Sequence, residues 1–269
     1  MAFDEETTII SHVPTGPGYH VMTLDAPKLA AALKPGQFVH LRIPGLEESA
    51  LRRPISVFDA EDGKVTILYK EVGRGTAQLV KARPGDKMNV MGPLGHGFPS
   101  SCKGVPLLVG GGFGVAPLYF LAKRLLKSGC EKTPVLFAGG RTKEDLLEIG
   151  RFEALGVKTL LATNDGSAGD KGFVTEPLDR TLAELKDAGE DFELFTCGPD
   201  GLLKAVSDRA VANGKPGWIS MDRHMICGVG ACFACIQAIR RADGSVYNAR
   251  CCVNGPVFKA SEIIWGDGK

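Results

Sequence analysis

Five cysteines near the C-terminal end of the chain have a spacing that suits metal–sulfur chemistry. Cys227, Cys232 and Cys235 follow the pattern C-x4-C-x2-C, and the adjacent Cys251 and Cys252 come after a turn signal. Three thiolates on one tight loop and a distant fourth are the ligand set of a plant-type [2Fe–2S] centre. Glycine and alanine dominate the positions between the first three cysteines, so backbone amides can approach and donate to sulfur. The pattern predicts a [2Fe–2S] cluster.

Other interpretations of these thiols stay open. Cys232 and Cys235 alone could form a redox dithiol or half of a zinc site. Zinc ribbons normally repeat the C-x2-C pair, which Cys251 and Cys252 do not. Spacing does not decide which of these two is the fourth cluster ligand. Neighbouring side chains on a strand point to opposite faces, so we expect only one of them to face the cluster.

A glycine-rich turn predicts a second site, for a pyrophosphate. The segment 107–117 runs from a buried type of strand through Gly110–Gly112 and Gly114 into a helix. Backbone N–H groups at such a helix start can approach phosphate, and Pro117 suits an early helical position. Tight packing alone also produces such turns.

A second turn between strand and helix contains Cys197–Gly198–Pro199. Ligands of open α/β sheets gather at the carboxyl ends of strands, where both turns are expected to lie. Taken alone, Cys197 would be an ordinary buried cysteine.

A weaker signal lies in the first hundred residues. Arg53 and Ser56 place a guanidinium and a hydroxyl beside a strand, and Thr76 follows a glycine turn at the start of a short helix, Ala77–Val80. Arginine can clamp a phosphate and a threonine at a helix start can donate to one. Both features are also common as plain structural elements.

The elements that must position these residues differ between the two halves of the chain. Residues 1–100 contain short apolar runs bounded by Gly and Pro, which predicts an antiparallel β-barrel or sandwich. Residues 101–214 alternate strands and helices, which predicts βαβ units and a mostly parallel sheet. Residues 215–269 hold the cysteines and a hairpin. The expected strands are 7–10, 19–24, 38–43, 55–59, 64–69, 105–109, 135–138, 159–162 and 193–197, and the expected longer helices are 117–126, 143–149, 175–187 and 201–212.

Composition narrows the function classes. A formal net charge of +1 gives no reason to expect nucleic acid as a partner. No apolar run approaches the ~20 residues that span a bilayer, and the acidic N-terminus does not resemble a signal peptide. We therefore expect a cytoplasmic protein whose clustered cysteines serve metal or redox chemistry.

The order of these elements resembles the ferredoxin–NADP reductase superfamily, in which a flavin barrel precedes an α/β nicotinamide domain. Arg53–Ser56 is similar to its flavin motif, Gly111–Pro117 to its pyrophosphate loop and Cys197–Pro199 to its nicotinamide-side signature. The segments 225–235 and 252–258 resemble those of electron-transfer subunits of dihydroorotate dehydrogenase B. The resemblance to these subunits covers nearly the whole chain. The fold implied is β plus α/β: an N-terminal barrel for FAD, an α/β domain for NAD and a [2Fe–2S] subdomain.

The resemblance also implies site residues. It selects Cys252 as the fourth ligand, although Asn254 stands where the family usually has Asp. Ser56 is the candidate for a hydrogen bond near the reactive flavin nitrogen, and Cys197 is the candidate for lining the nicotinamide pocket. FAD is expected at Arg53, Pro54, Ile55, Ser56, Leu68, Tyr69, Lys70, Gly75 and Thr76; NAD at Gly111, Gly112, Gly114, Val115, Ala116, Pro117, Cys197, Gly198 and Pro199; and the cluster at Cys227, Cys232, Cys235 and Cys252.

The implied partner is an FMN-binding dihydroorotate dehydrogenase catalytic subunit, in a heterotetramer of the pyrimidine biosynthesis pathway. Electrons would pass from FMN through the cluster and FAD to NAD. Arg141 and Lys143 could instead meet the 2′-phosphate of NADP, or be solvated loop charges. Two other functions stay open: a flavin subunit of an NADH-dependent ferredoxin, sulfide or hydrogenase oxidoreductase, and a non-catalytic redox sensor.

Overall fold

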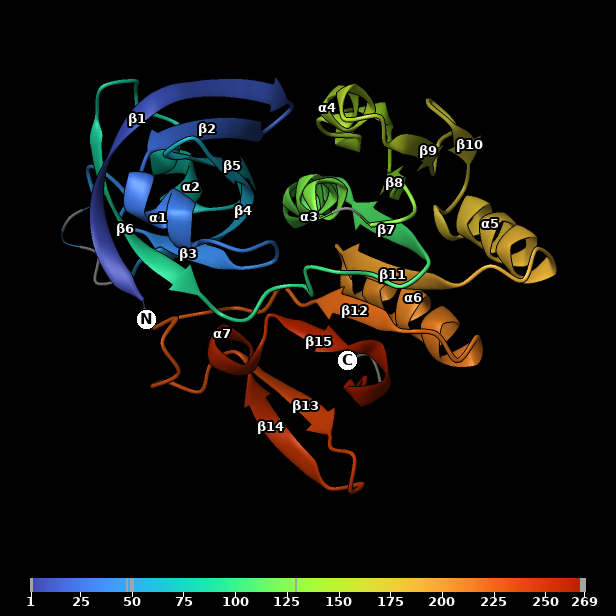
Figure 1. Ribbon diagram of the computed structural model, residues 1–269. Helices are drawn as coiled ribbons and strands as arrows, with labels where there is room; N and C mark the ends of the chain where they lie inside the picture. The colour runs from blue at the N-terminus through green and yellow to red at the C-terminus, as the bar shows by residue number, and fades with distance from the viewer. Residues whose placement is uncertain (1, 47, 49–50, 129, 267–269) are drawn as a thin grey trace.

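The N-terminal part of the chain is a closed antiparallel barrel, seen at the left of Figure 1. The computed structural model describes residues 2–46, 48, 51–128 and 130–266. The strands close in the order β1-β2-β5-β4-β3-β6, and aliphatic side chains from alternate positions fill the interior. The elements are β1 (Phe3–Gly16), β2 (Tyr19–Asp25), α1 (Pro27–Ala32), β3 (Phe38–Leu41), β4 (Arg53–Glu61), β5 (Lys64–Lys70), α2 (Arg74–Leu79) and β6 (Lys87–Leu94).

The barrel differs from the sequence-based expectation at two strands. β1 extends over fourteen residues, well beyond the expected 7–10. β6 was not expected at all, although every second residue from Met88 to Leu94 is buried. That alternation is the signal that could have found it. β6 closes the barrel because it pairs with both β1 and β3.

The second part is a seven-stranded sheet with helices on both faces (Figure 1). The strand order is β10-β9-β8-β7-β11-β12-β15, parallel except for the last pair. Helix α3 lies between the sheet and the barrel, and its apolar side packs with Phe58 and Leu68 of the barrel. The elements are β7 (Val105–Gly111), η1 (Gly112–Gly114), α3 (Val115–Lys127), β8 (Val135–Gly140), η2 (Lys143–Asp145), α4 (Ile149–Ala154), β9 (Lys158–Thr163), β10 (Asp170–Lys171), α5 (Thr175–Asp187), β11 (Phe192–Cys197), α6 (Asp200–Ala212) and β12 (Gly217–Ser220).

One expected helix was wrong. The stretch 143–149 forms only a 3-10 turn, Lys143–Asp145, and helix α4 begins at Ile149. Glu148 has a left-handed backbone with φ of 56°, which interrupts any helix through it. The break lets Leu147 turn into the core beside α3, where it is fully buried.

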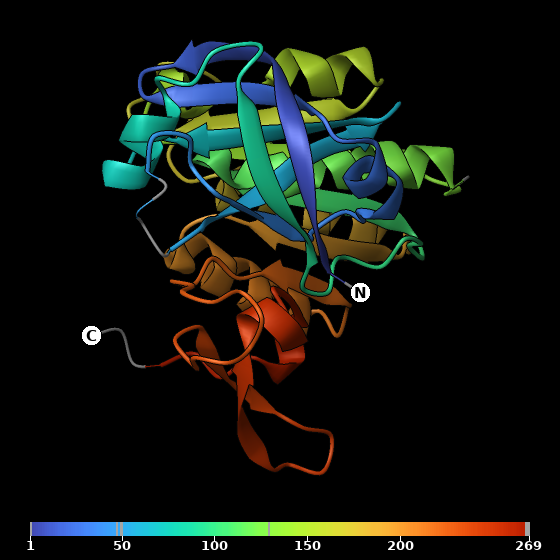
Figure 2. The same cartoon turned by 90° about the vertical axis from the view of Figure 1, so that its left-hand side faces the viewer.

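The C-terminal part forms a separate lobe below the other two, as Figure 2 shows. It is not wholly independent, because β15 pairs with β12 and adds a strand to the large sheet. Both β12, at Gly217–Ser220, and β15, at Val257–Lys259, belong to the large sheet, although they lie beyond position 214, where we expected the α/β domain to end. The elements are β13 (Ile236–Arg240), β14 (Val246–Arg250), α7 (Cys251–Asn254), β15 (Val257–Lys259) and η3 (Ala260–Glu262).

Among the described residues, no helix is long and apolar enough to cross a membrane. The longest helices, α3, α5 and α6, have thirteen residues each.

Candidate functional site

The order in which successive strands are added to the sheet reverses between β7 and β11. The strands that follow β7 extend to one side as β8, β9 and β10, whereas β11 lies on the other side of β7 and continues to β12. Because β7 and β11 are parallel, their carboxyl ends meet, with Cys197 beside Gly110. Such a switch point is where open α/β sheets bind ligands. Both sequence-predicted turns therefore lie at one crevice.

The two turns are packed so closely that only glycine fits between them. A Cβ at Gly114 would overlap the carbonyl oxygen of Cys197, and one at Gly111 would come within 2.8 Å of Pro199 Cδ. Gly198 in turn has a φ of 153°, and a Cβ there would lie 3.1 Å from the Gly111 amide nitrogen. The turn that opens α3 therefore has no Cβ atoms at Gly111 and Gly114, and a glycine-rich turn at a helix start suits a pyrophosphate. The residues fit the nucleotide expected there.

A single pocket joins the flavin motif to the nicotinamide turn. Pro54, Ile55 and Ser56 of β4 line it on the barrel side, and Cys197 lines it on the sheet side. These residues are more than 140 positions apart in the sequence but meet where the barrel docks on the sheet. The remaining lining residues are Phe38, Ser220, Met221, Asp222, Arg223, Met225 and Pro256.

Cys197 is a neutral thiol in this pocket. Burial raises its pKa to about 12, and the nearby carboxylate of Asp222 adds to the rise. The side chain is 7% exposed and it hydrogen-bonds with Ser220. A protonated thiol can contact a hydride acceptor without attacking it.

Sequence reasoning missed Ser220 and Asp222. Both come at the carboxyl end of β12, which was not among the expected strands. A parallel strand in this sheet delivers its following residues to the same edge as β7 and β11. The short apolar run before Ser220 is the only signal that could have pointed to them.

Arg53 approaches the first turn of α2, which begins at Arg74, earlier than the expected Ala77. A Cβ at Gly75 would overlap the Arg53 guanidinium, so this glycine allows the side chain to lie across the turn. The Arg53 Nη1 atom donates to the carbonyl of Leu51 at 2.6 Å. The Thr76 hydroxyl, which was expected to face a phosphate, instead closes its own turn. It accepts from the Val72 amide at 2.9 Å and donates to the Gly73 carbonyl at 3.1 Å.

The three expected residues of β5 do not share a face. Leu68 packs toward α3, and the Lys70 ammonium donates to Tyr19 Oη at 3.0 Å. Tyr69 belongs to the barrel core, where its hydroxyl hydrogen-bonds to His12 Nε2 at 2.8 Å. Its ring also stacks on His20 with centroids 5.4 Å apart. The Tyr69 side chain is therefore turned away from the side of β5 that faces the α/β domain.

The four candidate cluster cysteines lie as two pairs. Cys227 interacts with Cys232, and Cys252 hydrogen-bonds with Cys235. In the described part of the chain, no three cysteine, histidine or acidic side chains are grouped as they would be around one metal ion. Two pairs of thiols match a centre in which four thiolates are shared between two irons. The donor set of two thiol pairs thus fits a two-iron cluster.

Backbone amides of the loop favour a thiolate. Burial alone would raise the pKa of Cys227, but hydrogen bonds from the amides of Val229, Cys232 and Ala231 and from the Cys232 thiol bring it down to about 6. The Ala231 amide lies 3.3 Å from the sulfur. Gly228 and Gly230 have left-handed backbones, with φ of 70° and 84°, which turn these amides inward.

Cys251 and Cys252 differ in their surroundings. They begin helix α7 rather than lying on a strand, so the expected opposition of strand faces does not apply. The Cys252 amide lies 3.4 Å from Cys235 Sγ, and the Cys252 thiol interacts with both Cys235 and Cys227. Both residues are buried in the same apolar cluster, and the Cys251 thiol lies near Cys235 without an interaction with Cys227. The geometry favours Cys252 as the residue that faces the other candidate ligands.

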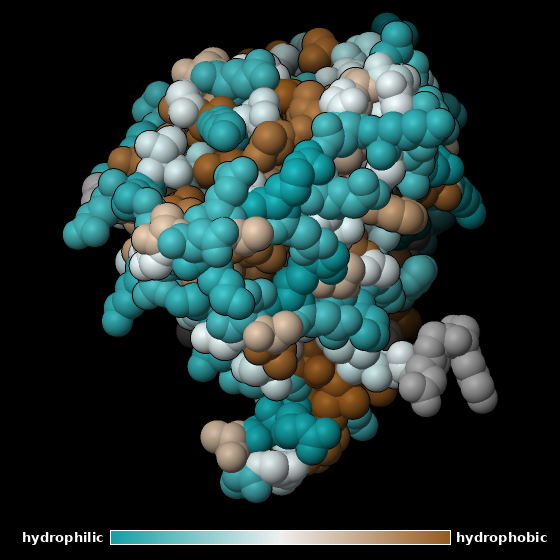
Figure 3. All heavy atoms as spheres, turned by 90° about the vertical axis from the view of Figure 1, so that its right-hand side faces the viewer, coloured by the Kyte–Doolittle hydropathy of each residue, from teal (hydrophilic) through white to brown (hydrophobic). Residues whose placement is uncertain are grey.

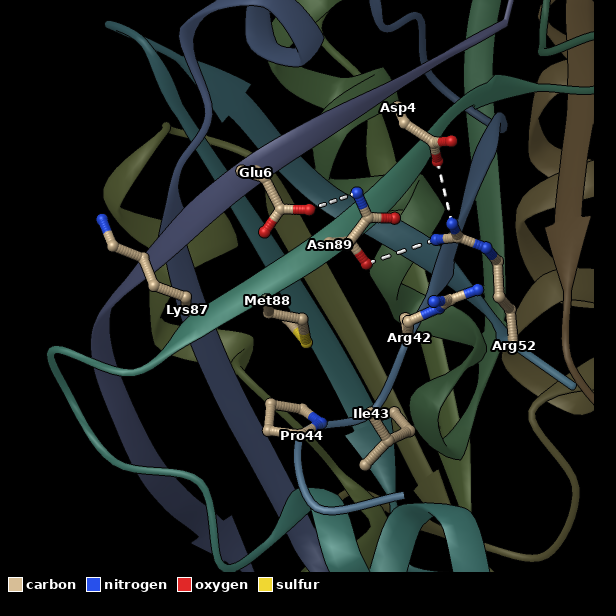
Figure 4. A pocket seen from close by; sticks show the side chains of 9 residues that line it. All are labelled: Asp4, Glu6, Arg42, Ile43, Pro44, Arg52, Lys87, Met88 and Asn89. Atoms are coloured by element: carbon tan, nitrogen blue, oxygen red, sulfur yellow. Dashed lines mark hydrogen bonds and ion pairs between the residues drawn. The ribbon is translucent and has the colours of Figure 1, made fainter. Parts of the chain in front are cut away.

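A separate hollow lies on the outer face of the barrel (Figure 4). Arg52 crosses it to Asp4 at 3.0 Å, and Asn89 hydrogen-bonds with Glu6. Its walls thus carry charges of both signs, which largely neutralise one another. The lining residues are Asp4, Glu6, Arg42, Ile43, Pro44, Arg52, Lys87, Met88 and Asn89, none of which was expected at a cofactor.

Two family models match the chain at the places where the structure gathers these residues. The model described as the iron–sulfur cluster binding domain of dihydroorotate dehydrogenase B matches residues 222–264. The oxidoreductase NAD-binding domain model matches residues 108–208. The chain therefore has an NAD-binding reductase domain and an iron–sulfur domain, in keeping with [2Fe–2S], FAD and NAD as its cofactors.

Full-length relatives agree with these matches. The dihydroorotate dehydrogenase B (NAD(+)) electron transfer subunit of Geobacillus thermodenitrificans is 39% identical over 97% of this chain and 98% of that protein. The corresponding subunit of Bacillus pumilus is 40% identical over 95% of this chain and 96% of that protein.

Solved structures show the same architecture. An NADH-dependent reduced ferredoxin–NADP oxidoreductase matches with a TM-score of 0.84 and 31% identity, over 96% of this chain and 90% of that one. A ferredoxin reductase of carbazole 1,9a-dioxygenase, at 21% identity and a TM-score of 0.66, covers 80% of this chain and 67% of that one, and shows the fold alone. The chain belongs to the family of dihydroorotate dehydrogenase B (NAD+) electron transfer subunits, within the ferredoxin–NADP reductase superfamily.

Proposed function

We propose that this chain takes electrons from an FMN-containing dihydroorotate dehydrogenase subunit and delivers them to NAD+ through [2Fe–2S] and FAD. The observation that carries the proposal is the pocket in which Ser56 of the flavin motif, Cys197 of the nicotinamide turn and Met225 of the segment leading to Cys227 meet. A pocket shared by these three segments supports the proposal, because sequential electron transfer requires the three cofactors to lie close to one another.

When bound, FAD supplies the exchange between the single electrons of a cluster and the hydride of a nicotinamide. The protein residues position these groups. We assign Arg53 to the flavin pyrophosphate, since a guanidinium makes a bidentate phosphate contact. We assign Ser56 to a hydrogen bond at the reactive flavin nitrogen. The neutral Cys197 thiol would line the nicotinamide pocket, where it excludes water without supplying a charge.

The remaining expected residues take supporting roles. The backbone of Leu68, Tyr69 and Lys70 would run along the flavin, while the Tyr69 ring stabilises the barrel from inside. Backbone amides hold the pyrophosphate of NAD at the start of α3, and the four paired thiols hold the cluster. NAD is favoured over NADP because Arg141, a candidate for a 2′-phosphate, already forms an ion pair with Asp145 at 3.5 Å.

The proposed partner interface is the apolar surface around the cluster loop and hairpin. Five large hydrophobic residues there are 44–59% exposed: Ile226, Val229, Phe233, Ile236 and Val246. Figure 3, which views the molecule from the side of α5 and α6, shows mainly hydrophilic side chains, with brown side chains in the upper body and where the C-terminal lobe begins. Apolar surface of this kind marks interaction sites, and a short path for electrons requires the partner close to the cluster. We propose a heterotetramer of two such pairs.

The experiment is to co-express the chain with an FMN-type dihydroorotate dehydrogenase, purify the complex and assay dihydroorotate-dependent NAD+ reduction. Val229→Asp should weaken co-purification and turnover at least tenfold. Val211→Asp is the matched control, because Val211 is equally exposed but lies on α6. A flavin- and cluster-loaded chain that neither binds this partner nor accepts its electrons would contradict the assignment of dihydroorotate.

A second candidate function rests on the structural match to the NADH-dependent reduced ferredoxin–NADP oxidoreductase. The name of that protein indicates ferredoxin as electron carrier, and the same pocket would serve it. Reduction of added ferredoxin by NADH, in the absence of dihydroorotate dehydrogenase, would favour this candidate. We also propose a cytoplasmic location, which suits a chain whose eight cysteines are all free thiols.

A further inference from the structure

His40 lies on strand β3, at the contact between the barrel and the C-terminal lobe. Phe38 and His40 point out of the barrel, whereas Val39 and Leu41 between and beyond them fill its core. The His40 side chain is nevertheless only 1% exposed. Neither Nδ1 nor Nε2 has a hydrogen-bond partner among the residues that the structure describes. A buried imidazole with two unmatched nitrogens is costly and calls for an explanation.

The cluster loop is what covers the ring. A Cβ at Gly228 would lie 2.5 Å from His40 Cε1 and 2.8 Å from each ring nitrogen. Both nitrogens therefore belong to the edge of the ring that meets the loop 227–232. Gly228 directly follows Cys227, and its φ of 70° lets the loop approach without a side chain. The unmatched nitrogens thus face the segment that carries two of the four candidate ligands.

The charged side chain that acts on this imidazole is a cation. The Arg52 guanidinium, seen in Figure 4 reaching Asp4, also donates to the backbone carbonyl of His40 at 3.4 Å. Burial, helped by this positive charge, lowers the pKa of His40 to about 4. At neutral pH the ring is therefore uncharged, with one N–H donor and one acceptor nitrogen.

His40 also touches the flavin side. It pairs with Pro54 across the β3–β4 ladder, and Phe38 of the same face pairs with Ser56. Phe38 and His40 have ring centroids 5.7 Å apart. The imidazole thus lies between the strand of the flavin motif and the loop of the cluster.

We propose that His40 is a positioning residue for the iron–sulfur centre, whose ring N–H donates to a sulfur atom of the loaded cluster. A bound cluster adds sulfur atoms at this loop, and sulfur can accept the hydrogen bond that the His40 ring N–H otherwise lacks. A hydrogen bond to sulfur stabilises the more negative, reduced state and so raises the reduction potential. The inference rests on the proposed function, in that it requires a cluster held by Cys227 and its partners.

The test is the midpoint potential of the cluster, measured by EPR-monitored titration of the purified, loaded chain. His40→Leu removes the donor. The equilibrium constant for reduction of the cluster should then fall about tenfold, which lowers the midpoint potential by 59 mV for one electron. His40→Gln keeps an N–H donor and should recover most of the shift. His20→Leu is the matched control: His20 lies on β2 and stacks on Tyr69, so the cluster potential should not change.

A second readout is direct. Histidine labelled with 15N in the ring should give a nitrogen coupling in pulsed EPR of the reduced cluster, and His40→Gln should abolish it. If His40→Leu fails to load, His40→Phe replaces it as a donor-free variant of similar shape. Loss of the cluster in His40→Leu and His40→Phe, but not in His40→Gln, would support the donor role. If none of the three variants binds a cluster, the nitrogen coupling of the labelled wild-type chain tests the donor role.

An unchanged potential in His40→Leu or His40→Phe, or no histidine coupling in the wild-type chain, would overturn the role of His40 and leave the cluster assignment standing. A wild-type chain without any [2Fe–2S] signal would instead overturn the cluster assignment itself.

Discussion

The carbonyl oxygen of Cys197 occupies the space that a Cβ at Gly114 would need. This contact joins the end of β11 to the turn that starts α3, so the nicotinamide side and the pyrophosphate side of the site are held at a fixed spacing. The two residues are neighbours because β7 and β11 are adjacent parallel strands. Any side chain at position 114 must push these turns apart.

Gly114→Ala should therefore weaken NAD binding. The added methyl group displaces the turn from the Cys197 carbonyl, and a pyrophosphate that loses one or two amide contacts loses roughly tenfold in affinity. We expect KM for NAD to rise at least tenfold, with FAD content unchanged. Gly150→Ala is the control, since a Cβ there meets nothing within 4 Å. Equal KM values for the two variants would contradict the role of this contact.

Replacing Ser56 or Cys197 should slow hydride transfer while the flavin is retained. Each substitution to alanine removes one contact at the pocket between flavin and nicotinamide, and a hydrogen bond in the transition state is worth roughly tenfold in rate. Stopped-flow reduction of the bound flavin by NADH measures this step. Ser11→Ala, on β1 and outside the pocket, should behave as the unmodified chain. Unchanged rates in Ser56→Ala and Cys197→Ala would reject both roles.

The two adjacent cysteines should respond differently to substitution by serine. Cys252→Ser removes a thiol that lies beside Cys235, so iron and sulfide content and the EPR signal should be lost. Cys251→Ser places a hydroxyl in the apolar core and should instead cost about 1–3 kcal/mol of stability with the cluster retained. The reverse result would make Cys251 the fourth ligand.

An ion-pair cluster between the barrel and α3 should make the docking of the two domains sensitive to acid. Lys123 of α3 bonds to Asp59 at 2.5 Å and to Glu61 at 2.7 Å, and Lys127 also pairs with Glu61. Hydrogen bonds from Lys123 and then Lys127 lower the pKa of Glu61 from 4.5 to about 2. The stability that Glu61 contributes is therefore complete above pH 4.5 and is lost as the pH falls toward 2.

Glu61→Gln should flatten this acid dependence. Because the Glu61 side chain is 37% exposed, solvent screening limits the effect to about 1 kcal/mol. Thermal unfolding midpoints at several pH values between 2 and 5 measure it, with Glu184→Gln on the exposed face of α5 as the control. If the two variants lose stability in parallel as pH falls, Glu61 makes no such contribution.

Local sequence was sufficient for the features that depend on short stretches of chain. The spacing of Cys227, Cys232 and Cys235 fits one loop, and its glycines predict the tight backbone that a cluster needs. The alternation of strands and helices from Val105 predicted the parallel sheet, and the glycines before Pro117 predicted the turn at its switch point. Each strand, helix or loop behind these signals lies within about twenty residues, where chain stiffness and hydrogen bonding determine the conformation.

The tertiary structure decided which distant residues meet. Asp222 joins Ser56 and Cys197 only because β12 lies beside β11 and the barrel docks on the same edge. Cys252 interacts with both Cys235 and Cys227, whereas Cys251 interacts with Cys235 alone, because α7 turns the two side chains in different directions. His40 looks like an ordinary strand residue until Gly228, nearly two hundred positions later, covers its ring. Burial and contact across such separations depend on how whole layers pack, and no local pattern encodes that packing.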